Sequence, residues 1–144
     1  MIVNSDITLY NKYYSKDEQC DKYIRTYLQG VNWQGKQAIK IGDKGLNSAD
    51  IISIYIPKSV DSGFKEYISP KKYQHLSDEE KEKYFTFGTG DKIVKGIIDF
   101  ELTGIKPNNE KHLEELYDDV VTIISTISNE NGSYSMQHWK VGCE

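Results

Sequence analysis

Apolar and polar residues alternate with a period of two along much of this chain, a pattern typical of strands with one buried face. The links "NWQGKQ" and "GDKGLNS" are rich in Gly, Asn and Asp, as turns are. Pro57 would end the last early strand, because proline has no backbone N–H for the ladder. The pattern predicts four strands in the first part of the chain, at residues 6–10, 21–33, 36–42 and 49–57.

The middle of the chain combines a helix signal with further strand signals. Ser77 is followed three residues later by Glu80, which is the spacing of a capping box, so we expect a short helix over residues 78–84. The alternation then resumes and predicts strands at 92–95 and 97–103. Four apolar side chains are expected to pin the helix to the sheet: Tyr73, Leu76, Tyr84 and Phe85.

The C-terminal part predicts a second short helix and a β-hairpin. The helix is expected at 109–119, with one apolar face formed by Leu113, Leu116 and Tyr117. Residues 120–128 are β-branched and apolar on both faces, so we expect them to form a central strand. The "NENG" turn then leads into a final strand at 133–141.

The cluster "MQHW" in that last strand raises two interpretations, a ligand-binding or catalytic corner or simply a strand. Alternation places Trp139 and Val141 toward the core, which leaves His138 pointing outward or toward a partner. The pattern therefore favours a strand that belongs to the core and to a sheet edge.

Together these elements predict a mainly β protein. Seven to eight mostly antiparallel strands, one or two short inserted helices and no βαβ rhythm favour a single small β-barrel or sandwich. We expect one domain over residues 1–144, with an insertion loop at about 59–87.

Composition narrows the class of function. The net charge is −4, whereas non-specific nucleic-acid binding needs a basic surface. No apolar run is long enough for a membrane span, and the first residues lack a signal-peptide pattern, so we expect the protein in a cytoplasm. Cys20 and Cys143 show no paired spacing and are expected to be free thiols.

The spacing of the candidate catalytic and metal-binding residues matches no known motif. The three histidines, His75, His112 and His138, lie far apart in the sequence and in no metal-ligand motif. "GTGDK" (residues 88–92) lacks phosphate-loop spacing, and its Gly90 predicts a turn. The carboxylates of "SDEEKEKY" suit the first turn of a helix rather than acid–base catalysis. We therefore predict no catalytic, cofactor-binding or metal-binding residue, and no enzyme.

Three blocks of sequence resemble a known family. They are "DITLYNKYY…YIRTYLQGVNWQGKQ", "GDKIVKG" and "DVVTIISTISNENGS…QHWKVG". In this order they look like small phage and prophage proteins from the head-to-tail region of long-tailed phages of low-GC Gram-positive bacteria. They are also similar to minor capsid proteins of the head-completion or stopper type, through residues 7–10, 31–33, 90–94 and 124–141.

The resemblance implies a virion structural protein that is assembled in the bacterial cytoplasm. Such a protein is a small barrel with inserted loops, and it forms a ring beneath the portal and adaptor. The ring closes the DNA channel and joins a tail-completion protein, while DNA passes through without sequence-specific binding. The insertion at 59–87 and the segment at 109–119 depart from the minimal barrel, and 59–87 is the expected gating or partner-facing element.

Two other functions stay open at this stage. One is a different connector role, such as tail completion. The other is a stand-alone binding module for carbohydrate or peptide, in which Trp33, Tyr55 and Tyr134 would be stacking platforms.

Overall fold

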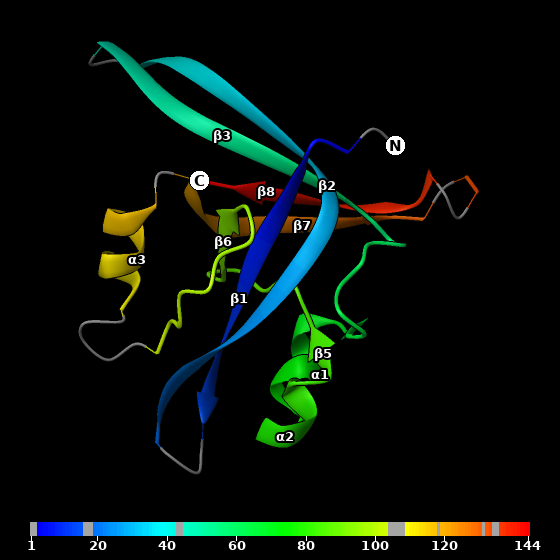
Figure 1. Cartoon of the computed structure of the whole chain (residues 1–144). Coiled ribbons are helices and arrows are strands. Elements are labelled where there is room, and N and C mark those ends of the chain that lie inside the picture. Colours follow the sequence, from blue (N-terminus) through cyan, green and yellow to red (C-terminus); the bar gives the residue numbers. More distant parts are fainter. Residues whose placement is uncertain are drawn as a thin grey trace.

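The structure is a computed structural model that describes residues 3–15, 19–42, 45–103, 109–117, 119–130, 132–133 and 136–144. Within these ranges, side chains are described for all residues except 20 and 36–51. The main strands are antiparallel and close into one barrel, which confirms the mainly β class and selects the barrel over the sandwich. In spatial order around the barrel they are β1 (Ser5–Ser15), β2 (Cys20–Gly42), β3 (Gly45–Pro57), β8 (His138–Cys143), β7 (Val120–Asn129) and β6 (Lys92–Lys95) (Figure 1).

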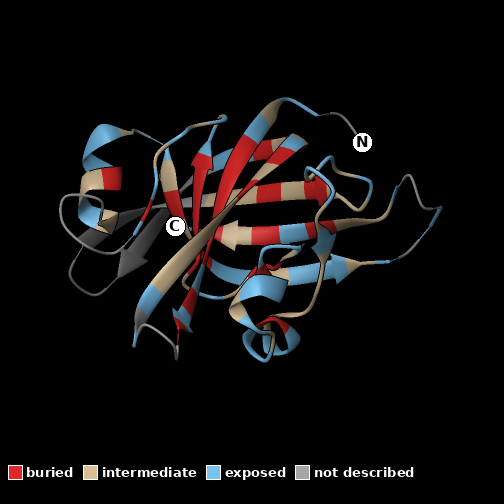
Figure 2. Ribbon diagram, turned by 60° about the horizontal axis from the view of Figure 1, so that its bottom comes forward, coloured by how far each residue is buried: buried red, intermediate tan, exposed pale blue. Residues whose placement is uncertain are grey.

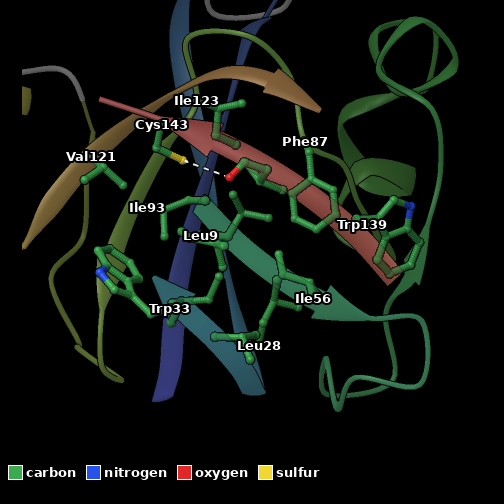
Figure 3. Packing of buried hydrophobic residues seen from close by; sticks show 14 of the residues in the cluster. Leu9, Leu28, Trp33, Ile56, Phe87, Ile93, Val121, Ile123, Trp139 and Cys143 are labelled. Carbon is green, nitrogen blue, oxygen red and sulfur yellow. Dashed lines mark hydrogen bonds between the residues drawn. The ribbon is translucent and has the colours of Figure 1, made fainter. Parts of the chain in front are cut away.

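Alternate residues of the barrel strands fill the interior. Figure 3 shows this core, and Figure 2 shows how burial follows the strands. Aliphatic side chains dominate it, as expected where strands must pack tightly against one another. Its fully buried members include Ile7, Leu9, Leu28, Val31, Ile54, Ile56, Ile93, Ile123 and Val141.

The helix α3 (Glu110–Leu116) covers the outside of the barrel wall. Tyr10 and Val94 follow core residues directly in sequence yet are also buried, because they face Leu113 of α3 in a second apolar cluster. The helix begins where the Asn109 side chain accepts a hydrogen bond from the His112 backbone N–H, at 3.0 Å. The predicted helix is thus confirmed, although Leu116 is 54% exposed and does not belong to its buried face.

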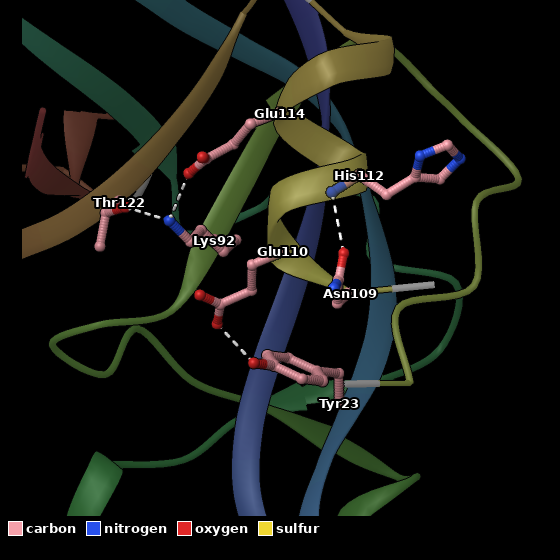
Figure 4. Close-up of polar contacts among 7 residues, drawn as sticks. All are labelled: Tyr23, Lys92, Asn109, Glu110, His112, Glu114 and Thr122. Carbon is pink, nitrogen blue, oxygen red and sulfur yellow. Dashed lines mark hydrogen bonds and ion pairs between the residues drawn. The ribbon is translucent and has the colours of Figure 1, made fainter. Parts of the chain in front are cut away.

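Two polar contacts hold α3 against the strands (Figure 4). The Tyr23 hydroxyl of β2 donates a hydrogen bond to the Glu110 carboxylate. Lys92 of β6 places its Nζ 3.0 Å from Glu114 Oε1 and 2.7 Å from the Thr122 hydroxyl. The helix is therefore tied to β2, β6 and β7 at once.

The insertion folds into a small unit of its own. Its elements are β4 (Glu66–Tyr67), α1 (Pro70–Gln74), α2 (Asp78–Lys81) and β5 (Tyr84–Phe85), with β4 and β5 pairing in parallel. Ser77 caps α2 by accepting a hydrogen bond from the Glu80 backbone N–H, which confirms the predicted cap. The predicted helix end at residue 84 is wrong, because residues 84–85 pair with β4.

The expected break between residues 33 and 36 is also wrong. β2 is one continuous strand, which pairs with β1 up to Val31 and with β3 from Asn32 to Gly42. At this point β2 changes its pairing partner from β1 to β3, and the chain makes no turn. Gly35 causes no break because strand pairing continues through it, opposite Ile52.

Two other strand predictions need correction. Residues 97–103 form no strand, because hydroxyl groups take their backbone bonds: Ile98 N–H donates to Thr8 Oγ1, and the Tyr10 hydroxyl donates to the Phe100 carbonyl. The final strand begins at His138 rather than at residue 133, and residues 134 and 135 lie outside the described part of the chain. The hairpin of β7 and β8 is confirmed.

Candidate interaction surfaces

The β2–β3 hairpin extends well beyond the barrel and forms an arm, defined as residues 36–42 and 45–51. β8 pairs with β3 only from Ile52 onward, so in the described chain the two halves of the arm pair with each other alone. Each half has seven residues, which at about 3.3 Å per residue gives an arm of roughly 23 Å. Figure 1 shows it leaving the barrel beside the remaining strands. Among the described strands, none pairs with either outer edge of the arm.

A second unpaired stretch of backbone lies on β7, and we name residues 124–128 the open edge. β6 pairs with β7 only from Val120 to Thr122, whereas β8 pairs with β7 as far as Asn129. Among described residues, no strand therefore pairs with the open edge on the side away from β8. The insertion touches it through the Thr126 hydroxyl, which donates to the Phe87 carbonyl at 3.3 Å.

The open edge is uncharged and combines two isoleucines with three hydroxyl residues. Ile124 is 47% exposed and Ile127 is 60% exposed, and β7 contains no charged residue at all. The prediction of a central strand is confirmed, since β7 lies between β6 and β8, although only its first half pairs with β6. Edge strands in soluble proteins usually carry Lys, Pro or a covering element that prevents pairing. On β7 the register of pairing with β8 shifts near Ile124, and its sequence contains neither Lys nor Pro.

The last hairpin presents a polar and aromatic outer surface. His138 lies on the outside, with its ring 5.6 Å from that of Tyr55. Lys140 places its Nζ 5.9 Å from the centre of the same Tyr55 ring. Trp139 and Val141 are buried, so the predicted inward and outward positions of this strand are confirmed.

The insertion is docked on the barrel rather than free. The ring centres of Tyr67, in β4, and Trp139 lie 4.6 Å apart. Both rings belong to an aromatic cluster that also includes Phe85 and Phe87. On the other side, the buried Lys81 donates to the Leu76 carbonyl at 2.7 Å and lies over the Tyr13 ring of β1. The exception is the loop before β4, where Phe64 is fully exposed.

A buried carboxylate joins the insertion to the barrel. Asp91 is 4% exposed and accepts hydrogen bonds from the Asn11 side chain (2.8 Å) and from the backbone N–H groups of Lys12 (3.1 Å) and Gly88 (3.0 Å). Burial raises the pKa of the Asp91 carboxyl to about 6, although these hydrogen bonds lower it. The sequence reveals the turn at Gly90 but not this role, because Asn11 lies 80 residues away.

One open pocket lies between the first strands and the insertion, with a volume of about 430 Å³. It contains the single arginine, Arg25, together with Lys65 and the carboxylates Glu82 and Glu101. Lys65 donates hydrogen bonds to the Arg25 carbonyl and to the Thr26 hydroxyl, and burial lowers its pKa. The lysine that lines the pocket is thus bound to the strand wall and joins the insertion to β2.

The histidines and the cysteines do not form a site. His75 ends α1, His112 lies on α3 and His138 on β8. No group of three potential metal ligands occurs among the residues that the structure describes. Cys143 is a free, buried thiol, and the side chain of Cys20 lies outside the description.

The proposed stacking platforms are separated as well. Trp33 is only 9% exposed and belongs to the core, so its prediction as a platform is wrong. Tyr55 is half-buried on the outer surface, and Tyr134 lies outside the described residues. The segment "GTGDK" forms the predicted turn, in which Gly90 has a φ of +95°. In "SDEEKEKY", the Asp78 carboxylate accepts a hydrogen bond from the Ser15 hydroxyl.

Comparisons with known proteins give one match, to a protein family. Searches of curated proteins and of solved structures returned no match. In the described part of the chain, no helix has the length and apolar character that a membrane crossing requires. Residues 2–144 match the family described as "Family of unknown function (DUF6751)", and the chain therefore belongs to that family.

Proposed function

We propose that this chain is a virion structural protein of the phage head–tail junction, a ring subunit of the head-completion or stopper type. Its partners would be further copies in the ring, the portal–adaptor assembly and a tail-completion protein. Double-stranded DNA would pass through the ring without sequence-specific contacts. Assembly would take place in the cytoplasm of the bacterial host.

The observation that carries this proposal is the arm. An isolated two-stranded hairpin is marginally stable in water, so residues 36–42 and 45–51 need a surface to rest on. The described part of the barrel does not provide one through strand pairing, because β8 pairs with β3 only as far as Ile52. A rigid barrel with a projecting arm suits a subunit that is held by its neighbours.

Further support comes from the three blocks of sequence on which the resemblance rests. They form β1 and most of β2, then β6, then β7 and β8, which are strands of the barrel wall. The net charge of −4 suits a channel that DNA must slide through, since an acidic wall repels phosphates. The insertion is docked on the barrel through Trp139 and Asp91, and it would be the part that meets another protein of the junction.

The binding-module alternative has lost one of its platforms, because Trp33 is a core residue. Tyr55 is the described aromatic side chain that still supports it, and His138 and Lys140 already pack beside its ring.

Gene neighbourhood and a deletion test the proposed function. Portal, capsid and tail-tube genes are expected on either side of this gene. In a lysogen that carries it, deletion is expected to give heads without tails that lose their DNA, together with separate tails, after induction. Filled heads joined to tails in the deletion strain would contradict the proposal.

A further inference from the structure

The arm and the open edge are both strand edges that have no pairing partner among the described strands. We propose that the arm of one copy pairs, strand to strand, with the open edge of β7 in the next copy. The arm offers backbone donors and acceptors at residues 36–42 and 45–51, and the open edge offers them at 124–128. This is β-strand addition between two copies of the same chain.

The open edge has the properties of a strand acceptor. Pairing with β8 on one side fixes its backbone, so the backbone groups on its other side are already ordered. It carries no charge and exposes Ile124 and Ile127, which gives an added strand apolar surface to cover. Native proteins normally protect such an edge, which indicates that this one is covered in its working state.

The arm has the matching properties of a donor. It pairs in register from Lys36 opposite Ile51 to Gly42 opposite Gly45, so its strands are extended before they meet a partner. Its sequence, "KQAIKIG" and "GLNSADI", contains no proline, so each strand can accept a full ladder. Its charged residues in the described positions are Lys36, Lys40 and Asp50, a net positive arm on an acidic chain. The chain itself carries an open edge that can receive such a strand, so a second copy is the occupant.

Arm and open edge are different surfaces, so their contact is head-to-tail. A head-to-tail contact leaves one arm and one open edge unused in every dimer, and it closes only as a ring or continues as a filament. The inference rests on the proposed function in one respect, since a ring needs a repeated contact of this kind. It adds which surfaces make that contact.

The experiment uses three variants of the full chain. Ile127→Lys places a charge on the open edge. Ile39→Lys with Ile41→Lys alters the part of β2 that pairs only with β3. Leu116→Lys is the control, because Leu116 is 54% exposed on α3 and belongs to neither surface. Circular dichroism confirms that each variant is folded, and sedimentation velocity gives its mass up to about 1 mM protein, where even weak contacts are populated.

Wild type and Leu116→Lys are expected to associate as concentration rises. Each of the other two variants should remain monomeric alone. Mixed in equal amounts, they should form a heterodimer and nothing larger, because each supplies one intact surface. In wild type, hydrogen exchange should slow at 36–42, 45–51 and 124–128 together, in step with association.

Several results would overturn the inference. They are a wild type that stays monomeric up to about 1 mM, an Ile127→Lys variant that associates like wild type, and a mixture of the two variants that stays monomeric. These outcomes are distinct from failure of the proposed function. Tailed particles from the deletion strain would leave strand pairing intact, and a monomeric wild type would leave the junction role open to the deletion experiment.

Discussion

Asn11 and Asp91 lie 80 residues apart in the sequence and are joined by a buried hydrogen bond of 2.8 Å. The Asn11 amide also donates to the Thr86 carbonyl at 2.6 Å, so a single side chain of β1 holds both the insertion and the start of β6. This pair is one of several buried polar contacts between the insertion and the barrel, as are those of Ser15 and Lys81.

Removal of the Asp91 carboxylate should therefore be costly. Asp91→Ala leaves the Asn11 amide and the backbone N–H groups of Lys12 and Gly88 without their acceptor. We expect the free energy of unfolding to fall by about 3 kcal/mol in urea denaturation. Asp119→Ala, at an exposed position, is the matched control and should change it by less than about 0.5 kcal/mol. Equal effects of the two substitutions would show that the buried network has no special role.

The same carboxyl should make stability depend on pH. Its folded pKa, about 6, lies above the ordinary value of 3.8, so the folded state binds a proton more tightly than the unfolded state. The stability contributed by this group is full below the unfolded pKa and is lost as pH rises through about 6. Relative to Asp91→Asn, which does not titrate, the free energy of unfolding of wild type should fall by about 3 kcal/mol in total as pH rises. A constant difference between the two proteins across that window would contradict the assignment.

Two leucines in α3 provide a matched test of the second apolar cluster. Leu113 is fully buried and Leu116 is 54% exposed, although the sequence places them on one face. Leu113→Ala should lower the free energy of unfolding by about 3 kcal/mol, because it leaves a cavity against Tyr10 and Val94. Leu116→Ala should cost less than about 1 kcal/mol. Urea denaturation of both variants checks the packing of α3 on the barrel, and a larger loss for Leu116→Ala would mean that α3 packs by another face.

Two glycines should respond in opposite ways to alanine. A Cβ on Gly88 would lie 3.1 Å from Asp91 Oδ2, inside the buried network, so Gly88→Ala should destabilise the protein by about 1–2 kcal/mol. A Cβ on Gly35 would meet nothing within 4 Å, so Gly35→Ala should be neutral or stabilise it by about 0.5 kcal/mol. Thermal unfolding of the two variants separates them, and a stabilising Gly88→Ala would mean that Asp91 does not lie where the structure places it.

Local signals in the sequence predicted the elements of this fold well. Period-two alternation located the barrel strands, the Ser77 cap located α2, and Trp139 was assigned correctly to the core. These features depend on neighbours in the chain, which a sequence displays directly.

Features that depend on distant partners were not predictable. Gly35 suggested a turn, but β2 runs through it because β3 pairs with its second half. Residues 120–128 form the expected central strand, but Ile124 and Ile127 are exposed because β6 pairs only with residues 120–122. Burial on a strand depends on where its neighbour ends, and the sequence of the strand does not contain that information.

The most direct test of the central claim is the position of this chain in assembled particles. A gold-binding tag after Glu144, which is exposed at the C-terminus, would mark the chain in particles purified from an induced lysogen. Electron microscopy is expected to show the label as a ring between head and tail in every tailed particle. Label absent from the particles, or located on the head surface or the tail tip, would contradict the proposed role at the head–tail junction.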